Sequence, residues 1–142
     1  MKLLPEDRER LIRYVDFMES ELSDFPKFLK IDWKAYLEDK DLRRNLERWI
    51  ENLVNCSIDI AKVILVAEDK RIPSTYKEIL RELGATQYFD EEFGENLSQW
   101  SILRNILAYE YLDIRWNSIK KFVQSSEPIY RKLITEIKSF LK

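Results

Sequence analysis

Apolar residues recur every three or four positions along most of the chain, which is the spacing of one face of an α-helix. The first such pattern begins at Pro5, since proline suits a first helical turn, and continues through Leu11, Val15, Met18 and Leu22. We expect it to end at Asp24-Phe25-Pro26, because the residue before a proline disfavours the helical conformation. Residues 25–32 are then expected to form a short loop, and Asp32 to cap a turn that carries Trp33, Tyr36 and Leu37.

The longest uninterrupted helical pattern runs from about Asp41 to Glu68 and carries two apolar stripes. One stripe contains Leu46, Trp49, Ile50, Leu53, Ile60 and Ile64. The other lies about 100° around the helix and contains Val54, Ile58 and Leu65. A helix with two stripes usually packs against two neighbouring helices, or against one neighbour and a second subunit. The pattern therefore contributes to our expectation of a homodimer that forms through its long helices.

Capping signals predict two further helices in the middle of the chain. Thr75 and Glu78 have the spacing of a capping box, so a helix should start there. Gly84 stands where a left-handed residue would end that helix. The next helix should start between Asp90 and Glu95, and it presents Trp100, Leu103 and Leu107 on one face.

Two helices are expected in the last third of the chain. Asp113 is a candidate cap for a short helix that reaches about Val123. Ser125 or Ser126, followed by Pro128 in the first turn, should start the last helix, which bears Ile129, Leu133, Ile137, Phe140 and Leu141. No internal repeat or linker interrupts the pattern. The sequence thus predicts one all-α domain over residues 1–142, built as a bundle of five or six helices.

Composition narrows the chemistry that this bundle can perform. The chain has no histidine and one cysteine, Cys56, so zinc sites of the usual ligand types and Ser-His-Asp or Cys-His catalysis are excluded. We expect no cofactor, and we expect Cys56 to be a buried thiol. The charged residues that begin at Glu6 leave no secretory leader, and no apolar run is long enough to cross a bilayer. The protein is accordingly expected in the cytoplasm, without a membrane partner.

The overall charge does not favour nucleic acid, because 24 basic and 26 acidic side chains give a formal net charge of −2. An RNA ligand would depend on a local basic patch. Candidates are the basic residues that follow Trp100–Trp116, namely Arg115, Lys120, Lys121, Arg131 and Lys132. The alternative is that they form an ordinary solvated surface, and we expect only weak RNA affinity.

The segment Trp100–Trp116, WSILRNILAYEYLDIRW, combines a helical repeat with an unusual group of polar residues. Arg104, Ala108 and Tyr111 are related by i, i+4 and i+7, which places them on one face of a continuous helix. Tyr109 is about 140° round that helix from Arg104 and about 7.5 Å along it. The two would converge only if the helix loosens after Ala108, or if a second copy meets it. From these residues alone, Arg104 has either a functional role or a structural one, paired with Glu110 or a helix-terminal carbonyl.

Three segments together carry a family resemblance: RNILAYEY, the preceding LRRNLERWIENLVNCSIDIAKVIL, and the link IPSTYKEILRELG with its Pro-x-x-Tyr. They resemble the HepT-like branch of the HEPN helical domains, whose motif is Arg-Asn, three residues, His, any residue, then Tyr. The resemblance implies an all-α bundle that dimerises and brings the motifs of both subunits to a shared cleft. It also implies a metal-independent ribonuclease that acts as a toxin. The antitoxin would be a small MntA-like nucleotidyltransferase that attaches AMP to the last tyrosine of the motif.

Residue by residue, the resemblance makes Arg104 the phosphate-stabilising arginine, Asn105 its companion and Tyr111 the AMP acceptor. Tyr109 occupies the position of the histidine. A phenol with a pKa of about 10 is ionised only about one part in a thousand at pH 7, whereas imidazole is suited to proton transfer near neutrality. One interpretation is a ribonuclease toxin of weak activity, with Arg104, Asn105 and Tyr109 as its catalytic residues. Another is a catalytically inactive HEPN subunit that binds a nucleotide or a nucleotidyltransferase, and a third is a helical adaptor without any nucleotide link.

Overall fold

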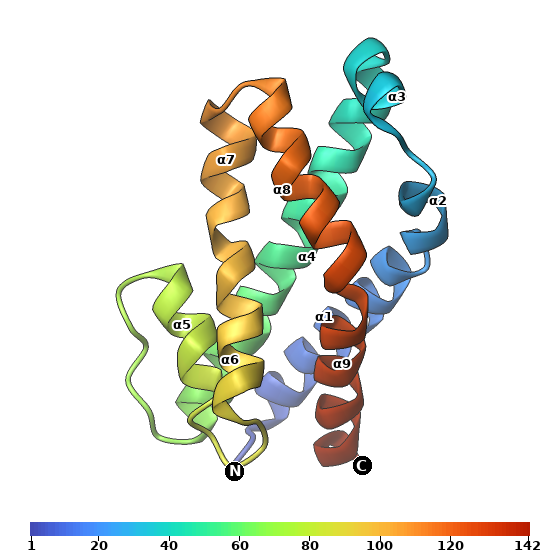
Figure 1. Cartoon of the computed structure of the whole chain (residues 1–142). Coiled ribbons are helices and arrows are strands. Elements are labelled where there is room, and N and C mark those ends of the chain that lie inside the picture. The colour runs from blue at the N-terminus through green and yellow to red at the C-terminus, as the bar shows by residue number, and fades with distance from the viewer.

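All six expected helices are present in the computed structural model, which describes residues 1–142 (Figure 1). The all-α class is thereby confirmed. The fourth expected helix continues through a short 3₁₀ turn, η1, into α7. In chain order the six are α1 (Pro5–Leu22), α4 (Lys40–Ala67), α5 (Tyr76–Leu83), α6 (Glu91–Ser98) with η1 (Gln99–Ile102) and α7 (Leu103–Tyr109), α8 (Leu112–Ser125) and α9 (Glu127–Leu141). None of them is both long and apolar enough to cross a membrane.

Two short helices, α2 (Phe25–Leu29) and α3 (Trp33–Glu38), connect α1 to α4. The expectation of a loop over residues 25–32 was therefore wrong for its first part. Helix α1 ends at Leu22, close to the predicted stop, but Phe25 is itself helical, and Pro26 falls in the first turn of α2, where its missing N–H is not needed. Asp32 caps α3 as expected, because its side chain accepts a hydrogen bond of 2.8 Å from the backbone N–H of Ala35.

Helix α4 forms the centre of the bundle, and the other helices cover it from several sides (Figure 1). It contacts α1, α3, α5 and α7. Both of its apolar stripes are buried within the chain, including Val54, Ile58 and Leu65 of the second stripe. Neighbouring helices of the same chain thus cover both stripes. The second stripe accordingly gives no support to a dimer, and a dimer requires a different surface.

Helices α5 and α6 pack with their backbones unusually close, at Gly84 and Gly94. Gly84 follows α5 with φ −69°, so the expected left-handed stop was wrong. Glycine is required for space instead. A Cβ atom on Gly84 would lie 2.5 Å from the carbonyl oxygen of Asp90, and one on Gly94 would lie 2.5 Å from that of Arg81. This contact fixes α5 against the segment that leads into α7.

The last two helices form as predicted, except that the N-cap of α8 is a different residue. Tyr111 precedes α8 as its N-cap, and Asp113 lies in the first turn, where its charge suits the helix dipole. Ser126 is the N-cap of α9, as expected, although its buried hydroxyl oxygen has no hydrogen-bond partner. Cys56 is buried as predicted, and burial is the main reason why its pKa rises to about 12.

Candidate active site around Arg104

Arg104 and the two motif tyrosines lie on either side of a helix end. Helix α7 ends at Tyr109, because Glu110 adopts an extended conformation with φ −91° and ψ 161°. The chain then begins α8, so Tyr111 is not on the face that Arg104 and Ala108 share. The predicted common face was therefore wrong for Tyr111. The turn between α7 and α8 lies at the end of the molecule opposite the two chain termini (Figure 1).

The guanidinium of Arg104 packs against the aromatic ring of Tyr76, at the start of α5. Its Cζ atom is 4.5 Å from the ring centroid, and Nζ of Lys62 is 5.7 Å from the same centroid. The hydrogen-bonding capacity and charge of Arg104, followed by the charge of Lys62, lower the pKa of the Tyr76 phenol from its ordinary value. Sequence reasoning missed Tyr76, although it is the tyrosine of the Pro-x-x-Tyr segment.

Arg104 has no carboxylate partner within the chain. The ion pairs of the protein involve other side chains, and neither Glu110 nor a helix-terminal carbonyl binds this guanidinium. Arg104 therefore does not form the pair with Glu110 that a purely structural role would have given it. A guanidinium whose partner is one tyrosine, through the ring and the phenol, keeps other N–H donors for an anion such as a phosphate.

A hollow of about 360 Å³ surrounds this arginine, which we call the arginine hollow. Three of the sequence-predicted residues, Arg104, Asn105 and Tyr109, line it together, and Tyr111 does not. Tyr109 is 83% exposed and therefore occupies the rim. The other lining residues come from α4, α5, η1 and α7: Glu51, Asn55, Tyr76, Ser101 and Ala108. No group of three or more acidic, cysteine or histidine side chains is placed to hold a metal ion.

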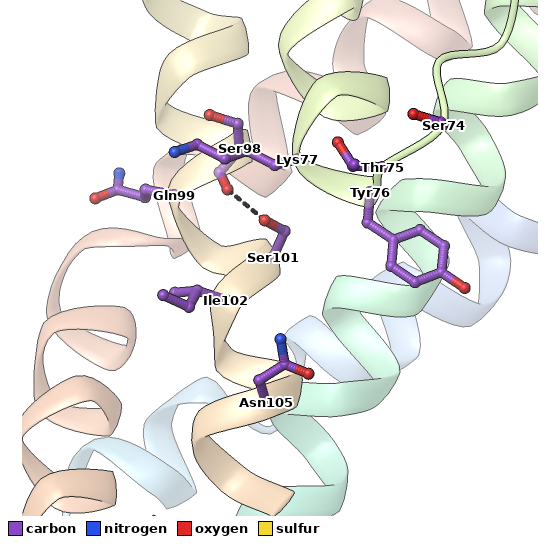
Figure 2. Close-up of a pocket in the computed structure, with 9 residues that line it drawn as sticks. All are labelled: Ser74, Thr75, Tyr76, Lys77, Ser98, Gln99, Ser101, Ile102 and Asn105. Atoms are coloured by element: carbon purple, nitrogen blue, oxygen red, sulfur yellow. Dashed lines mark hydrogen bonds between the residues drawn. The ribbon is translucent and has the colours of Figure 1, made fainter. Parts of the chain in front are cut away.

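A second hollow of about 580 Å³, the serine hollow, adjoins the first (Figure 2). It is lined by Ser74, Thr75, Tyr76, Lys77, Ser98, Gln99, Ser101, Ile102 and Asn105. Figure 2 shows the start of α5, with Thr75 and Tyr76, across from η1 and the beginning of α7, with Ser101 and Asn105. Tyr76, Ser101 and Asn105 line both hollows, which are therefore adjacent parts of one surface.

Arg115 has a structural role that the sequence did not reveal. Its Nε donates to the carbonyl oxygen of Glu110 over 2.7 Å, and its Nη1 lies 3.2 Å from Oε1 of Glu47. Glu47 also accepts a hydrogen bond from the hydroxyl of Tyr36. The arginine thereby anchors the α7–α8 turn, and hence Tyr109 and Tyr111, to helix α4.

The predicted basic patch is consequently reduced. Arg115 is engaged with Glu47, and Arg131 forms an ion pair of 2.8 Å with Glu127 one turn earlier. Lys132 lies over the ring of Phe93, with Nζ 5.2 Å from its centroid. Of the five candidates, these three have partners within the chain. The cations that flank the two hollows are instead Arg104, Lys62 and Lys77.

Comparison with known proteins gives a family match and a structural match. The family model described as "Ribonuclease HepT-like" matches residues 18–137. A solved structure of the tri-AMPylated HEPN toxin of Shewanella oneidensis, in complex with MNT antitoxin, has a similar fold. The TM-score is 0.78 with 18% sequence identity, over 92% of this chain and 97% of that one. A search of curated proteins found no match.

Proposed function

Because this chain belongs to the HepT-like ribonuclease family, we propose that it is a metal-independent endoribonuclease that acts as the toxin of a toxin–antitoxin pair. The observation that carries this proposal is the setting of Arg104. Its guanidinium has no carboxylate partner and faces a hollow that Asn105 and Tyr109 also line. These are the groups needed to hold a phosphodiester and to stabilise its transition state.

In the proposed reaction, the 2′-hydroxyl oxygen of the RNA attacks the adjacent phosphorus, and the bond to the 5′-oxygen breaks. Arg104 stabilises the negative charge that develops on the phosphate oxygens, a contribution worth about 10²–10³-fold. Asn105 orients the phosphate. At the rim, the phenolate of Tyr109 accepts the proton of the 2′-hydroxyl, and the resulting phenol returns it to the departing 5′-oxygen, which leaves as a hydroxyl beside a 2′,3′-cyclic phosphate. A phenol replaces imidazole poorly near pH 7, and general acid–base help is worth about 10²–10⁴-fold, so we expect slow cleavage.

We propose an MntA-like nucleotidyltransferase as the antitoxin partner, with Tyr111 as the AMP acceptor. Two observations support this: the structurally similar toxin is AMPylated and bound to an MNT antitoxin, and Tyr111 is 83% exposed at the α7–α8 turn. Incubation with such an enzyme and ATP should add AMP to the wild-type chain and to Tyr109→Phe. Tyr111→Phe should remain unmodified by mass spectrometry. Modification of Tyr111→Phe to the wild-type extent would exclude this acceptor.

A catalytically inactive subunit that binds a nucleotide or a nucleotidyltransferase is the second candidate. The exposure of Tyr109 favours it, because an exposed phenol lacks the enclosed surroundings in which a proton-transfer group is best tuned. In that case Arg104 and Asn105 would still bind phosphate groups, and the protein would bind a partner without cleaving RNA.

We also propose a homodimer in the cytoplasm, with α1 and α4 forming the contact. A further hollow between these helices is lined by Phe17 and Asn55, and Asn55 also lines the arginine hollow. A second copy at this surface would lie beside the site. Sedimentation at micromolar concentration should show a dimer that Phe17→Glu weakens, while Leu29→Glu, at a similarly exposed position on α2, should have no effect. A wild-type monomer would contradict the proposal.

The decisive experiment measures RNA cleavage in EDTA by the wild type, Tyr109→His, Arg104→Ala and the control Arg131→Ala. Arg131 is an exposed arginine in an ion pair on α9, away from the hollow. Cleavage by the wild type and the control, with a loss of about 10²–10³-fold in Arg104→Ala, supports the ribonuclease. Cleavage only by Tyr109→His indicates an intact site without its proton-transfer group. No cleavage by any variant favours the inactive subunit.

A further inference from the structure

The serine hollow is continuous with the proposed catalytic surface and has a different chemistry. Tyr76, Ser101 and Asn105 line both hollows, and Arg104, whose guanidinium packs against the ring of Tyr76, lines the arginine hollow alone. A phosphate held by Arg104 would therefore have its attached sugar and base at the entrance of the serine hollow. An RNA chain continues on both sides of the cleaved bond, so one side has to occupy neighbouring surface.

The polar atoms of this hollow suit a sugar and a base. Ser101 donates its hydroxyl to the carbonyl oxygen of Ser98 over 2.8 Å and keeps its own oxygen as an acceptor (Figure 2). Thr75 accepts from the N–H of Glu78, which leaves its hydroxyl hydrogen free to donate. Gln99 uses one amide N–H for the carbonyl oxygen of Asn96 and keeps its carbonyl oxygen. Donors and acceptors are thus both available to a ribose or a base edge.

The volume of the serine hollow and the charges that line it also suit a nucleoside and its phosphates. A volume of about 580 Å³ falls within the range of small-molecule sites, about 300–1,000 Å³. Tyr76 is 46% exposed although Arg104 and Lys62 lie over its ring, so part of this side chain remains accessible for contact with a base. Lys77, the next residue of α5, lines the serine hollow but not the arginine hollow, and so supplies a second cation there. Glu51 is the one acidic lining residue, and it belongs to the arginine hollow.

We propose that the serine hollow binds a nucleoside of single-stranded RNA next to the phosphate held by Arg104, with Lys77 contacting the following phosphate. This inference rests on the proposed ribonuclease function and assigns the path of its substrate. A duplex is disfavoured, because a base has to leave its stack to enter the hollow and pack on Tyr76.

The test uses a fluorescent 2′-O-methyl hexanucleotide, which is not cleaved because it lacks the attacking hydroxyl. Binding is followed by anisotropy in EDTA for the wild type, Arg104→Ala, Lys77→Ala and Ile102→Glu. Ile102 is 57% exposed and lines only the serine hollow, so the new carboxylate should repel the RNA without unfolding the chain. Matched controls are Val66→Glu, at a residue that is 55% exposed, and Lys34→Ala, at an exposed lysine on α3.

We expect Ile102→Glu to raise the Kd at least tenfold and Lys77→Ala to reduce the salt slope of binding by about 0.7, the value for one phosphate contact on a single strand. Both controls should bind like the wild type. Weaker binding by Arg104→Ala, with unchanged binding by Ile102→Glu and Lys77→Ala, would overturn the subsite and leave the ribonuclease standing. Failure of the wild type to bind RNA would overturn both. If AMP binds in the serine hollow and RNA does not, the site takes a free nucleotide and the inference is wrong.

Discussion

The contact between Gly84 and Gly94 sets the position of Tyr76 relative to Arg104, and the substitution Gly94→Ala tests this. In an exposed helix, replacing glycine by alanine stabilises by about 1 kcal/mol. Here the new Cβ atom would lie 2.5 Å from the carbonyl oxygen of Arg81 and 3.0 Å from backbone atoms of Gly84. These neighbours are backbone atoms, so they cannot rotate away, and α5 has to move as a unit.

Overpacking of this kind costs about 1–3 kcal/mol, and backbone neighbours place it at the upper end. After the gain in helix propensity, we expect a net loss of about 2 kcal/mol. That corresponds to a decrease in Tm of about 4–8 °C for a domain of this size. The loss in unfolding free energy is measured by urea unfolding, followed by circular dichroism. A displaced α5 also separates Tyr76 from Arg104, so the pKa of the Tyr76 phenol should rise towards its ordinary value.

The control is Asn96→Ala, on the same helix, whose side chain makes no hydrogen bond within the chain and is partly exposed. Alanine is a better helix former than asparagine, so this variant should be as stable as the wild type or slightly more stable. If Gly94→Ala is also at least as stable as the wild type, the close approach of the two backbones is not a constraint. The position of α5 would then have to depend on other contacts.

Two further variants test single interactions at the site. Arg115→Ala leaves the largely buried carboxylate of Glu47 without its cation, so the free energy of unfolding should fall by about 1–3 kcal/mol. Urea titration measures this value. An unchanged free energy of unfolding would show that Arg115 does not anchor the α7–α8 turn. Arg104→Ala removes the largest cause of the lowered pKa of Tyr76, so the ultraviolet titration of this phenol should shift to higher pH. The signal of Tyr76 is assigned as the one that disappears in Tyr76→Phe. No shift would mean that Arg104 does not contact this ring.

Helices were predictable from the sequence because their signals are local. The capping side chain of Thr75 accepts from the N–H of Glu78, and Asp90 accepts from the N–H of Phe93, as short-range patterns indicated. The end of α7 has no such signal, since neither a glycine nor a proline follows Tyr109. At this helix end, Nε of Arg115 donates a hydrogen bond to the carbonyl oxygen of Glu110, a contact that no local pattern indicates.

The candidate site was predictable only in part, because sequence signals are local and some of its residues come together through long-range packing. Arg104, Asn105 and Tyr109 do line one hollow, and α7 ends at Tyr109, directly after Ala108, where the sequence allowed Arg104 and Tyr109 to converge. Tyr76 joins them from a helix whose start lies 28 residues before Arg104, and the packing of α5 on α4, α6 and η1, including the close contact at Gly84 and Gly94, brings it close. Long-range backbone contacts of this kind leave no periodic pattern in a single sequence.

The absence of histidine gives the proposed reaction a pH dependence that distinguishes it from an imidazole enzyme. The arginine hollow is lined by two phenols, Tyr76 and Tyr109, and no group in the hollow has an ordinary pKa near 7. If a phenolate accepts the proton of the 2′-hydroxyl, the ionised fraction rises tenfold per pH unit below its pKa. The cleavage rate of the wild type should therefore rise between about pH 7 and pH 9, without a maximum near neutrality. Tyr109→His should instead reach half of its plateau rate near pH 6.5, the ordinary pKa of imidazole, and level off above it. Because Arg104 stabilises the phosphate in both proteins, Arg104→Ala should lower both curves. If Tyr76 is the phenol that accepts the proton, the wild-type curve should also shift to higher pH, since Arg104 lowers the pKa of Tyr76. A wild-type profile with a maximum near neutrality would show that a group other than these phenols transfers the proton.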